Sequence, residues 1–372
     1  MIRAARHDAD GYTIRLFEPG DRDGYLALHR EVLGGGSDEW FDWKYVDNPY
    51  ADHVAVVVAT DGDRVVGAKS GMGFEVGRGD ERFLALQPGD TMVHPDHRRQ
   101  GVYSRMTEFM KSTYADAPQA LFFNYPNAAT LPGSLKHGWS EVGTVTTRYR
   151  VADPVGFAGV GAGPLEDAVG RAGRAVAGGL LGVPRLGSRV ADGLSVRRHR
   201  EIPVATLADL YRRAVPDTFH VVRDETYLGW RYGNPRWEYT AYTVERGGRP
   251  VLGAVVGVDD DADPTVASVV DVLPMRGSGT GRADDPARRD AEYALFDRIV
   301  ASSEAGVFAA ADGAVSPSTA ARFGFLPDTA PPLSWVATPS TLVAYPLDEA
   351  VDTPALASLD GWTLGLSDRD TR

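Results

Sequence analysis

A segment that occurs twice constrains the fold of this 372-residue chain more than any other feature of its sequence. The sequence Trp-Lys-Tyr-Val-Asp-Asn-Pro, which ends at Pro49, returns one residue shorter as Trp-Arg-Tyr-Gly-Asn-Pro, which ends at Pro235. The pairs Gly138-Trp139 and Gly324-Phe325 stand at the same separation of 186 residues as the two prolines. Landmarks that keep one separation indicate two tandem copies of one structural unit. Two unrelated domains that share turn chemistry are the alternative.

Each copy is predicted to contain a helix, a hairpin, a further strand, a helix, a strand, a short helix and a last strand. In the first copy we expect helices at 21–33 and 101–114, and strands at 54–60, 64–77, 82–93, 120–124 and 141–151. Apolar residues at helical spacing predict the helices, and alternation around turns predicts the strands. Strands joined by hairpins and crossed by helices favour the α/β (α+β) class, with a mixed, mostly antiparallel sheet flanked by helices in each copy.

The repeat divides the chain into four predicted segments. Residues 1–153 form the first domain and residues 196–345 the second. Residues 154–195, rich in Gly, Ala and Arg, are expected to form a partly helical connector. In the tail, residues 346–372, the alternation of Trp362, Leu364 and Leu366 predicts a final strand.

The composition excludes several classes of function. The chain has no cysteine, which excludes disulfides, thiolate nucleophiles and cysteine-based metal sites. Its 51 acidic and 39 basic residues give a net charge of −12, which repels nucleic acid and anionic membranes as partners. Without a long apolar segment, the chain is expected to be cytoplasmic. An Asp-rich, Lys-poor sequence favours a halophilic source, with a GC-rich genome as the alternative.

The stretch from Thr91 to Ser104 carries the most chemistry. A predicted strand ends there, a turn follows, and a helix begins at Gly101 after Arg98, Arg99 and Gln100. Free N–H groups at a helix start bind anions, and glycine permits close approach of the backbone, so a diphosphate would fit this position. An ordinary turn with solvated arginines is the alternative.

The pattern Pro95-x-x-Arg98-x-x-Gly101-Val102 resembles the acyl-CoA-binding motif of the GNAT superfamily of N-acyltransferases. Tyr103 departs from the small residue usual at that position of the family. The flanking strands and helices extend the resemblance over residues 12–151 and, through the repeat, over 196–345. The resemblance therefore implies a tandem GNAT-fold protein with a degenerate second copy.

The resemblance also implies which residues hold acyl-CoA. The backbone of Met92 and Val93 would bind the pantetheine arm, and the amides from Arg99 to Ser104 would bind the pyrophosphate. Asn127 would lie near the thioester end, although it could equally cap the next helix. The residues implied in cofactor binding are Met92, Val93, Arg98, Arg99, Gln100, Gly101, Val102, Tyr103, Ser104 and Asn127.

The catalytic acid and base are harder to assign. Members of the family often use a tyrosine as the acid, but its position here holds Ser134. Tyr103 and Tyr125 are nearby phenols, of which Tyr125 is our candidate, with packing as the alternative for both. Asp90, on the strand that leads into the motif, is the candidate base. A solvent-facing strand position is the alternative for Asp90, and Asp368 and Asp370 are further candidates.

Other features favour structural roles. In the second copy the loop from Gly277 to Asp285 is glycine-rich but carries two acids, so we expect that copy not to bind CoA. His94 and His97 lack a third ligand nearby, so no metal site is predicted. The aromatic segment 40–45 recurs in the copy without the motif, which favours packing as its role.

The sequence therefore predicts an N-acyltransferase, most simply an acetyltransferase, that uses acetyl-CoA or another acyl-CoA and no metal. Its acceptor would be an amine of a small molecule or an amino sugar, which attacks the thioester directly because no cysteine is present. Two alternatives stay open. One is a CoA-binding regulatory protein without catalysis. The other is a transferase of the same fold that uses another donor such as aminoacyl-tRNA, which the acidic surface disfavours.

Overall fold

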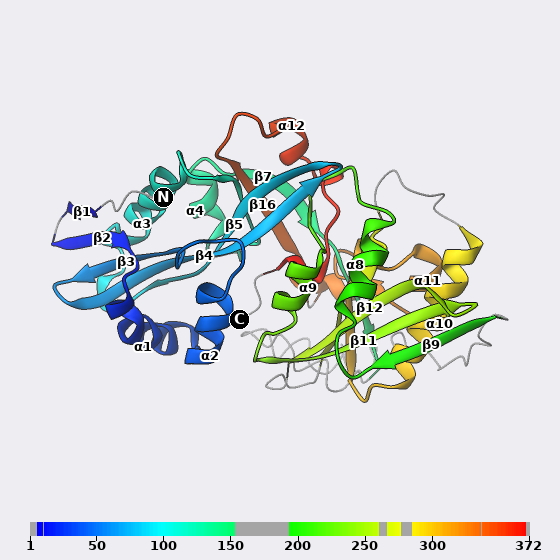
Figure 1. The fold of residues 1–372 in the computed structure, drawn as a ribbon. Coiled ribbons are helices and arrows are strands. Elements are labelled where there is room, and N and C mark those ends of the chain that lie inside the picture. The colour runs from blue at the N-terminus through cyan, green and yellow to red at the C-terminus, as the bar shows by residue number, and fades with distance from the viewer. Residues whose placement is uncertain are drawn as a thin grey trace.

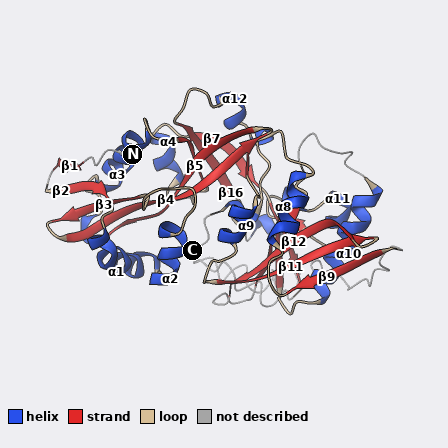
Figure 2. Cartoon of the chain, viewed as in Figure 1, coloured by secondary structure: helices blue, strands red, loops and turns tan. Residues whose placement is uncertain are grey.

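The computed structural model describes residues 6–9, 11–152, 193–259, 266–276, 285–335 and 337–369. It contains two mixed sheets, each with helices against it, that lie side by side (Figures 1 and 2). Strands β5 and β6 pair in parallel, as do β13 and β14, and the other strand pairs are antiparallel. The predicted fold class is confirmed. The connector predicted at 154–195 lies outside the described residues, except at its end.

The first sheet has the strand order β1-β2-β3-β4-β5-β6-β16-β7, with β10 paired to β4. Its strands are β1 (Arg6–Ala9), β2 (Tyr12–Leu16), β3 (Val56–Asp61), β4 (Arg64–Arg78), β5 (Glu81–Val93), β6 (Gln119–Asn124), β7 (Ser140–Val145), β10 (His220–Val221) and β16 (Ser340–Pro346). Its helices are α1 (Arg22–Leu33), α2 (Asp38–Phe41), α3 (Val102–Tyr114) and α4 (Leu131–Lys136), with a π-helical turn at Asp42–Val46. Helix α3 buries Val102 and Met106 against one face, as its apolar stripe predicts.

The second sheet has the order β15-β8-β14-β13-β12-β11-β9. Its strands are β8 (Thr147–Val151), β9 (Leu194–His199), β11 (Trp237–Arg246), β12 (Arg249–Asp259), β13 (Val266–Leu273), β14 (Val307–Ala311) and β15 (Leu326–Pro327). The helices of this half are α8 (Val204–Arg212), α9 (Glu225–Arg231), α10 (Pro286–Ala301) and α11 (Pro317–Phe323).

The two halves exchange a strand. Residues 141–151, expected as one final strand, form β7 and β8, and β8 lies between β14 and β15 in the second sheet. In return, β16 from the second half lies between β6 and β7 in the first sheet. Assigning both final strands to their own halves is therefore wrong. Because of this exchange, each sheet contains a strand from the other half of the chain. The predicted boundaries at 153 and 196 therefore separate the two copies in the sequence, but they do not separate the two sheets.

The repeated aromatic segment forms the contact between the halves. The rings of Trp43 and Trp230 stack with centroids 5.7 Å apart. Each indole N–H donates to the backbone carbonyl of the other tryptophan, at 2.8 Å in both directions. The repeat therefore places equivalent residues against each other across an approximate two-fold arrangement. This geometry agrees with the structural role expected for the segment.

The tail differs from its prediction. Helix α12 (Thr353–Leu356) is followed by two 3-10 turns, at Leu359–Gly361 and Leu366–Asp368, and Trp362 forms a single bridge with Phe219. The alternation of Trp362, Leu364 and Leu366 thus does not form a strand. The segment runs beside β13 instead, where Gly365 lies against Asp271 and Arg223.

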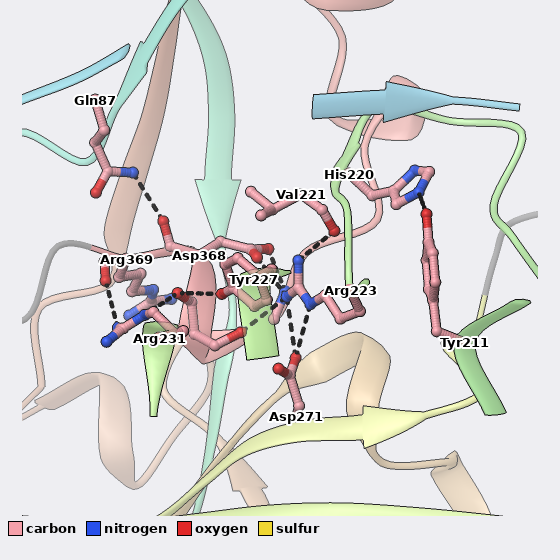
Figure 3. A network of polar contacts seen from close by, with 12 residues as sticks. Gln87, Tyr211, His220, Val221, Arg223, Tyr227, Arg231, Asp271, Asp368 and Arg369 are labelled. Carbon is pink, nitrogen blue, oxygen red and sulfur yellow. Dashed lines mark hydrogen bonds and ion pairs between the residues drawn. The ribbon is translucent and has the colours of Figure 1, made fainter. Parts of the chain in front are cut away.

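A buried histidine joins the halves at β10. His220 donates from Nδ1 to the Thr218 carbonyl at 2.8 Å. Its Nε2 accepts from the Tyr211 hydroxyl, also at 2.8 Å (Figure 3). Burial lowers the pKa of His220 to about 4. Because an unfolded histidine titrates near 6.5, the unfolded chain takes up more protons as the pH falls from 7 toward 4, and stability falls with it.

We expect this effect to remove about 2 kcal/mol of unfolding free energy between pH 7 and pH 5. Urea unfolding at the two pH values measures the difference. His220→Phe, which cannot titrate, should lose that part of the pH dependence even if its stability at pH 7 is lower. An unchanged pH dependence in this variant would show that folding does not lower the pKa of His220.

Candidate functional site

Strands β5 and β6 of the first sheet separate beside the predicted motif. Strands β5 and β6 pair only from Leu84 to Leu86, opposite Gln119 to Phe122, while β5 stays paired with β4 as far as Val93. The segment of β5 from Gln87 onward therefore has one edge that is not paired with β6. A strand edge that is not paired with its neighbour suits an extended ligand arm, because the arm can bind to the strand's backbone groups.

A bulge interrupts β5 along this open segment. The register with β4 shifts between the pairs Ala68–Met92 and Ser70–Gly89, and Asp90 within the bulge has a φ of 38°. Bulges re-aim side chains next to functional sites, and aspartate tolerates positive φ better than most residues. Met92 is buried and Val93 is half-buried at the end of the strand.

The loop after β5 has the conformation of an anion site. Arg99 and Gly101 have φ values of 62° and 79°, and α3 starts immediately afterwards at Val102. Left-handed residues next to a helix start present successive N–H groups on one side, and the first-turn amides, here up to Ser104, lack intrahelical partners. Arg98 and Arg99 are exposed beside them. These backbone and side-chain groups together favour a diphosphate.

Several side chains of the motif fix the loop. The Arg98 Nε donates to the Val93 carbonyl at 3.1 Å, which ties the loop to the end of β5. Gln100 accepts from the Tyr12 hydroxyl at 2.8 Å and donates to the Asp96 carbonyl at 3.0 Å. Gln100 is therefore a positioning residue. Asn127 accepts from the amides of the following turn at 3.1 and 3.0 Å, which is the capping role considered for it.

Tyr103 reaches across from α3 to α4. A Cβ on Gly133 would lie 3.0 Å from its hydroxyl oxygen, and its ring lies 5.9 Å from that of His137. Burial raises the pKa of Tyr103, against hydrogen bonds that include one to Ser134. The phenol of Tyr103 thus lies beside the position where the family resemblance places its tyrosine.

Asp90 lies in a buried ion pair on the face opposite α3. Its Oδ2 accepts from Lys44 Nζ at 2.6 Å and from the Tyr45 hydroxyl at 2.7 Å, and His29 Nε2 lies 3.9 Å from Oδ1. Burial alone would raise the pKa of Asp90, but Lys44 and the hydrogen bonds hold it well below its ordinary value. A carboxylate held in this way is a weak base, so the base role of Asp90 stays a prediction that its contacts do not favour.

The second half repeats this carboxylate. Tyr232, the equivalent of Tyr45, donates its hydroxyl to Asp271 on β13, and Arg223 forms an ion pair with Asp271 at 3.0 Å. The half that lacks the anion motif therefore keeps the tyrosine–aspartate contact. This recurrence favours a structural role for the contact in both halves.

The tail and the second half form a buried polar network beside the open end of the first sheet (Figure 3). Arg223, which is fully buried, forms ion pairs with Asp271 and Asp368, and Gln87 on β5 donates to the Asp368 carbonyl at 2.8 Å. Burial raises the pKa of Asp368 despite the arginine. The carboxyl group of Asp368 is thus paired with Arg223. Asp370 lies outside the described residues.

Tyr125 lies next to this network. Its hydroxyl is buried, and the Arg369 guanidinium lies 5.3 Å from the centre of its ring. Burial and the nearby Asp368 raise the pKa of Tyr125 above its ordinary value. Tyr125 is therefore on the tail side of the opening, whereas Tyr103 is on the α3 side. Its catalytic role stays a prediction.

The equivalent opening in the second half holds the tail. Strands β13 and β14 pair from Val266 to Val269, and beyond that point Gly365 lies against the backbone of Val270. The acidic loop at 277–284 lies outside the described residues, and Asp285 caps α10. A tail segment in this place supports the expectation of no second cofactor site.

Three further residues bear on the site and were not predicted from the sequence: Lys69, Arg223 and Gln87. All three are buried, and two of them contact segments far away in the sequence. A lysine inside the long apolar run of β4 was the available sequence indication for Lys69. In the described ranges, no group of three metal-ligating side chains occurs, and no helix there has the length and hydropathy to cross a bilayer.

Comparison with known proteins agrees with this geometry. Residues 13–142 match the family model described as an acetyltransferase (GNAT) domain. No curated protein matches the chain. The fold resembles a GCN5-related N-acetyltransferase from Anabaena variabilis ATCC 29413, with a TM-score of 0.59, 10% identity, and coverage of 91% of this chain and 73% of that one.

Two other solved structures share the fold over 91% of this chain and 72% of their own. One is a probable N-acyltransferase from Enterococcus faecalis V583, with a TM-score of 0.58 and 11% identity. The other is a GCN5-related N-acetyltransferase from Kribbella flavida, with a TM-score of 0.55 and 15% identity. At these identities the likeness establishes the fold, and the family model adds the identity of the first half. Residues 13–142 thus match a GNAT acetyltransferase domain, and the chain as a whole shares its fold with these solved structures.

Proposed function

We propose that this protein transfers an acyl group, most simply acetyl, from acyl-CoA to the amine of a small molecule or an amino sugar. The observation that carries the proposal is the anion site at the start of α3, placed at the end of the β5 segment that has parted from β6. That arrangement suits a nucleotide diphosphate with an extended arm. Because the chain has no cysteine, the amine attacks the thioester directly.

We expect calorimetry to give one acetyl-CoA site per chain. The first half has the anion loop, whereas the tail lies in the corresponding opening of the second half. Acetyl-CoA and CoA should both bind, and both should raise the melting temperature in proportion to the logarithm of their excess over Kd. Two equal sites would contradict the assignment of the loop as the single site.

Turnover is tested on the same samples. A panel of amines and amino sugars is incubated with acetyl-CoA, and free CoA thiol is measured against time. Release of CoA that depends on an amine supports the transferase. Tight binding of acetyl-CoA with no acceptor-dependent release across the panel would favour the CoA-binding regulatory alternative, which the serine at position 134 motivates.

A further inference from the structure

Lys69 is a buried lysine to which the described part of the chain supplies no counter-charge. It lies on β4, is 6% exposed, and its Nζ is 3.4 Å from the Thr91 hydroxyl in the bulge of β5. No carboxylate of the described residues lies within 4 Å of it. Lys44 gives the contrast within the same domain, since it is also buried but is paired with Asp90 at 2.6 Å. A buried cation without a counter-charge is costly and rarely retained for packing alone.

The amine lies between the bulge and the anion loop. Lys69 shares a face of β4 with Gly67, whose Cβ position contacts Val102 and Met106 of α3. Its Nζ lies 5.3 Å from the centre of the Tyr103 ring, in the first turn of that helix. On the other side its neighbour is Val57 of β3. Lys69 is therefore under the start of α3, beside the part of β5 that has left β6.

The surroundings of Lys69 make its ammonium group a stronger acid than that of an exposed lysine. Burial lowers its pKa to about 8, close to the value near 8.5 that is ordinary for an alkyl thiol. The titratable group that faces it is the Tyr103 phenol from α3, while β5 contributes the neutral hydroxyl of Thr91. Proton transfer is most efficient between groups of similar pKa near the working pH.

The transfer reaction needs such a donor. When an amine attacks the thioester, the C–N bond forms, the C–S bond breaks, and the electron pair leaves on sulfur. Ser134 is too weak an acid to protonate a thiolate. Asp90 and Asp368 are held by Lys44 and Arg223. Burial raises the pKa of the Tyr103 and Tyr125 phenols, which makes them weaker proton donors than an ordinary phenol.

We propose that Lys69 donates a proton to the sulfur of CoA as the acyl group leaves; this assignment rests on the N-acyltransferase function proposed above. One N–H proton of the ammonium passes to sulfur and gives CoA thiol. The neutral amine of Lys69 then regains a proton from those that the acceptor ammonium releases as it becomes an amide. In the resting complex with CoA, the same ammonium stabilises the thiolate.

The test follows the thiol of bound CoA by the ultraviolet absorbance of the thiolate, from pH 6 to pH 10. In the unaltered protein we expect the thiol to titrate below free CoA, with about tenfold more thiolate than the free thiol near neutral pH, as a cation a few ångströms away produces. In Lys69→Met the bound thiol should titrate like free CoA. Turnover of this variant should fall by about 10²-fold, with the Kd of acetyl-CoA changed less than threefold.

Lys136→Met is the matched control, since it removes a lysine from the exposed face of the neighbouring α4. It should behave like the unaltered protein. If the unaltered protein binds CoA but leaves the thiol unshifted, or if Lys69→Met keeps the shift, the assignment of Lys69 is overturned and the transferase proposal stands. If the unaltered protein binds neither CoA nor acetyl-CoA, both proposals are overturned.

Discussion

Replacing Gly101 with glutamate is expected to weaken acyl-CoA binding by at least about 10²-fold, to the point where calorimetry detects none. The substitution adds a negative charge next to the free amides at the start of α3, where a diphosphate would bind. Two unit charges 4 Å apart repel by about 4 kcal/mol at the effective dielectric of a protein surface, which alone exceeds a hundredfold loss. Space is not limiting, since a Cβ on Gly101 would meet only the Arg105 side chain, at 3.8 Å.

The backbone adds a second effect that needs a control. With a φ of 79°, Gly101 is left-handed, so any other residue there costs roughly 1–2 kcal/mol. A turn residue at a helix start would accept a side chain freely only if its φ were negative, which is not the case for Gly101. Gly248 has a φ of 76° and open space around it, in a turn of the second half. Gly248→Glu should therefore lose similar stability but keep full affinity for acetyl-CoA. Equal affinity in the two variants would remove the loop from the binding site.

The sequence predicts the local elements well, including the turn that leads into α3, because their determinants are local. Helix α3 and the strands around it follow from apolar spacing, and the loop follows from a glycine between arginines and a helix start. The repeat also predicts two sheets. All of these depend on residues that are near one another in the chain.

The strand exchange could not be predicted in the same way. Strands β7 and β8 are separated by one residue, and alternation shows that both are strands without showing which sheet each one joins. The partner of β8 is β14, more than 150 residues later, and only the packing of the halves decides that pairing. The tail is a similar case. Its alternating residues face a neighbour that exists only after both sheets have formed.

The burial of Lys69 and Asp90 could not be predicted from the sequence for a related reason. An isolated lysine or aspartate in a strand is usually solvent-facing, and burial depends on what covers the strand. Here α3 covers Lys69, and the π-helical turn at Asp42–Val46 covers Asp90. The sequence does contain the partner of Asp90, because Lys44 and Tyr45 belong to the repeated segment. A search for the acid that this segment would bind in each half would have selected Asp90 and Asp271.

Asp90→Asn is expected to lower the free energy of unfolding by about 3–5 kcal/mol, because it leaves the buried Lys44 ammonium without its counter-charge. Asparagine tolerates the positive φ of this position, so the loss of stability reports the removal of the charge and not backbone strain. Since folding lowers the pKa of Asp90, the pair contributes fully above the unfolded value near 3.9, and its contribution is lost as the pH falls below that value. Denaturant unfolding at pH 7 and at pH 3 should show the variant's deficit at the first pH and a smaller one at the second.

The double variant Lys44→Met, Asp90→Asn separates the two possible roles of this carboxylate. Removing both charges should recover much of the lost stability, because no unpaired ion then remains. If Asp90 only supports the fold, the double variant should also keep the turnover of the unaltered protein. If Asp90 is the general base, turnover should stay about 10²-fold lower in both variants even when they are fully folded, and the loss should shrink at high pH, where the acceptor amine is already neutral. The recurrence of the contact at Tyr232 and Asp271, in the half without an anion loop, favours recovery of turnover along with stability.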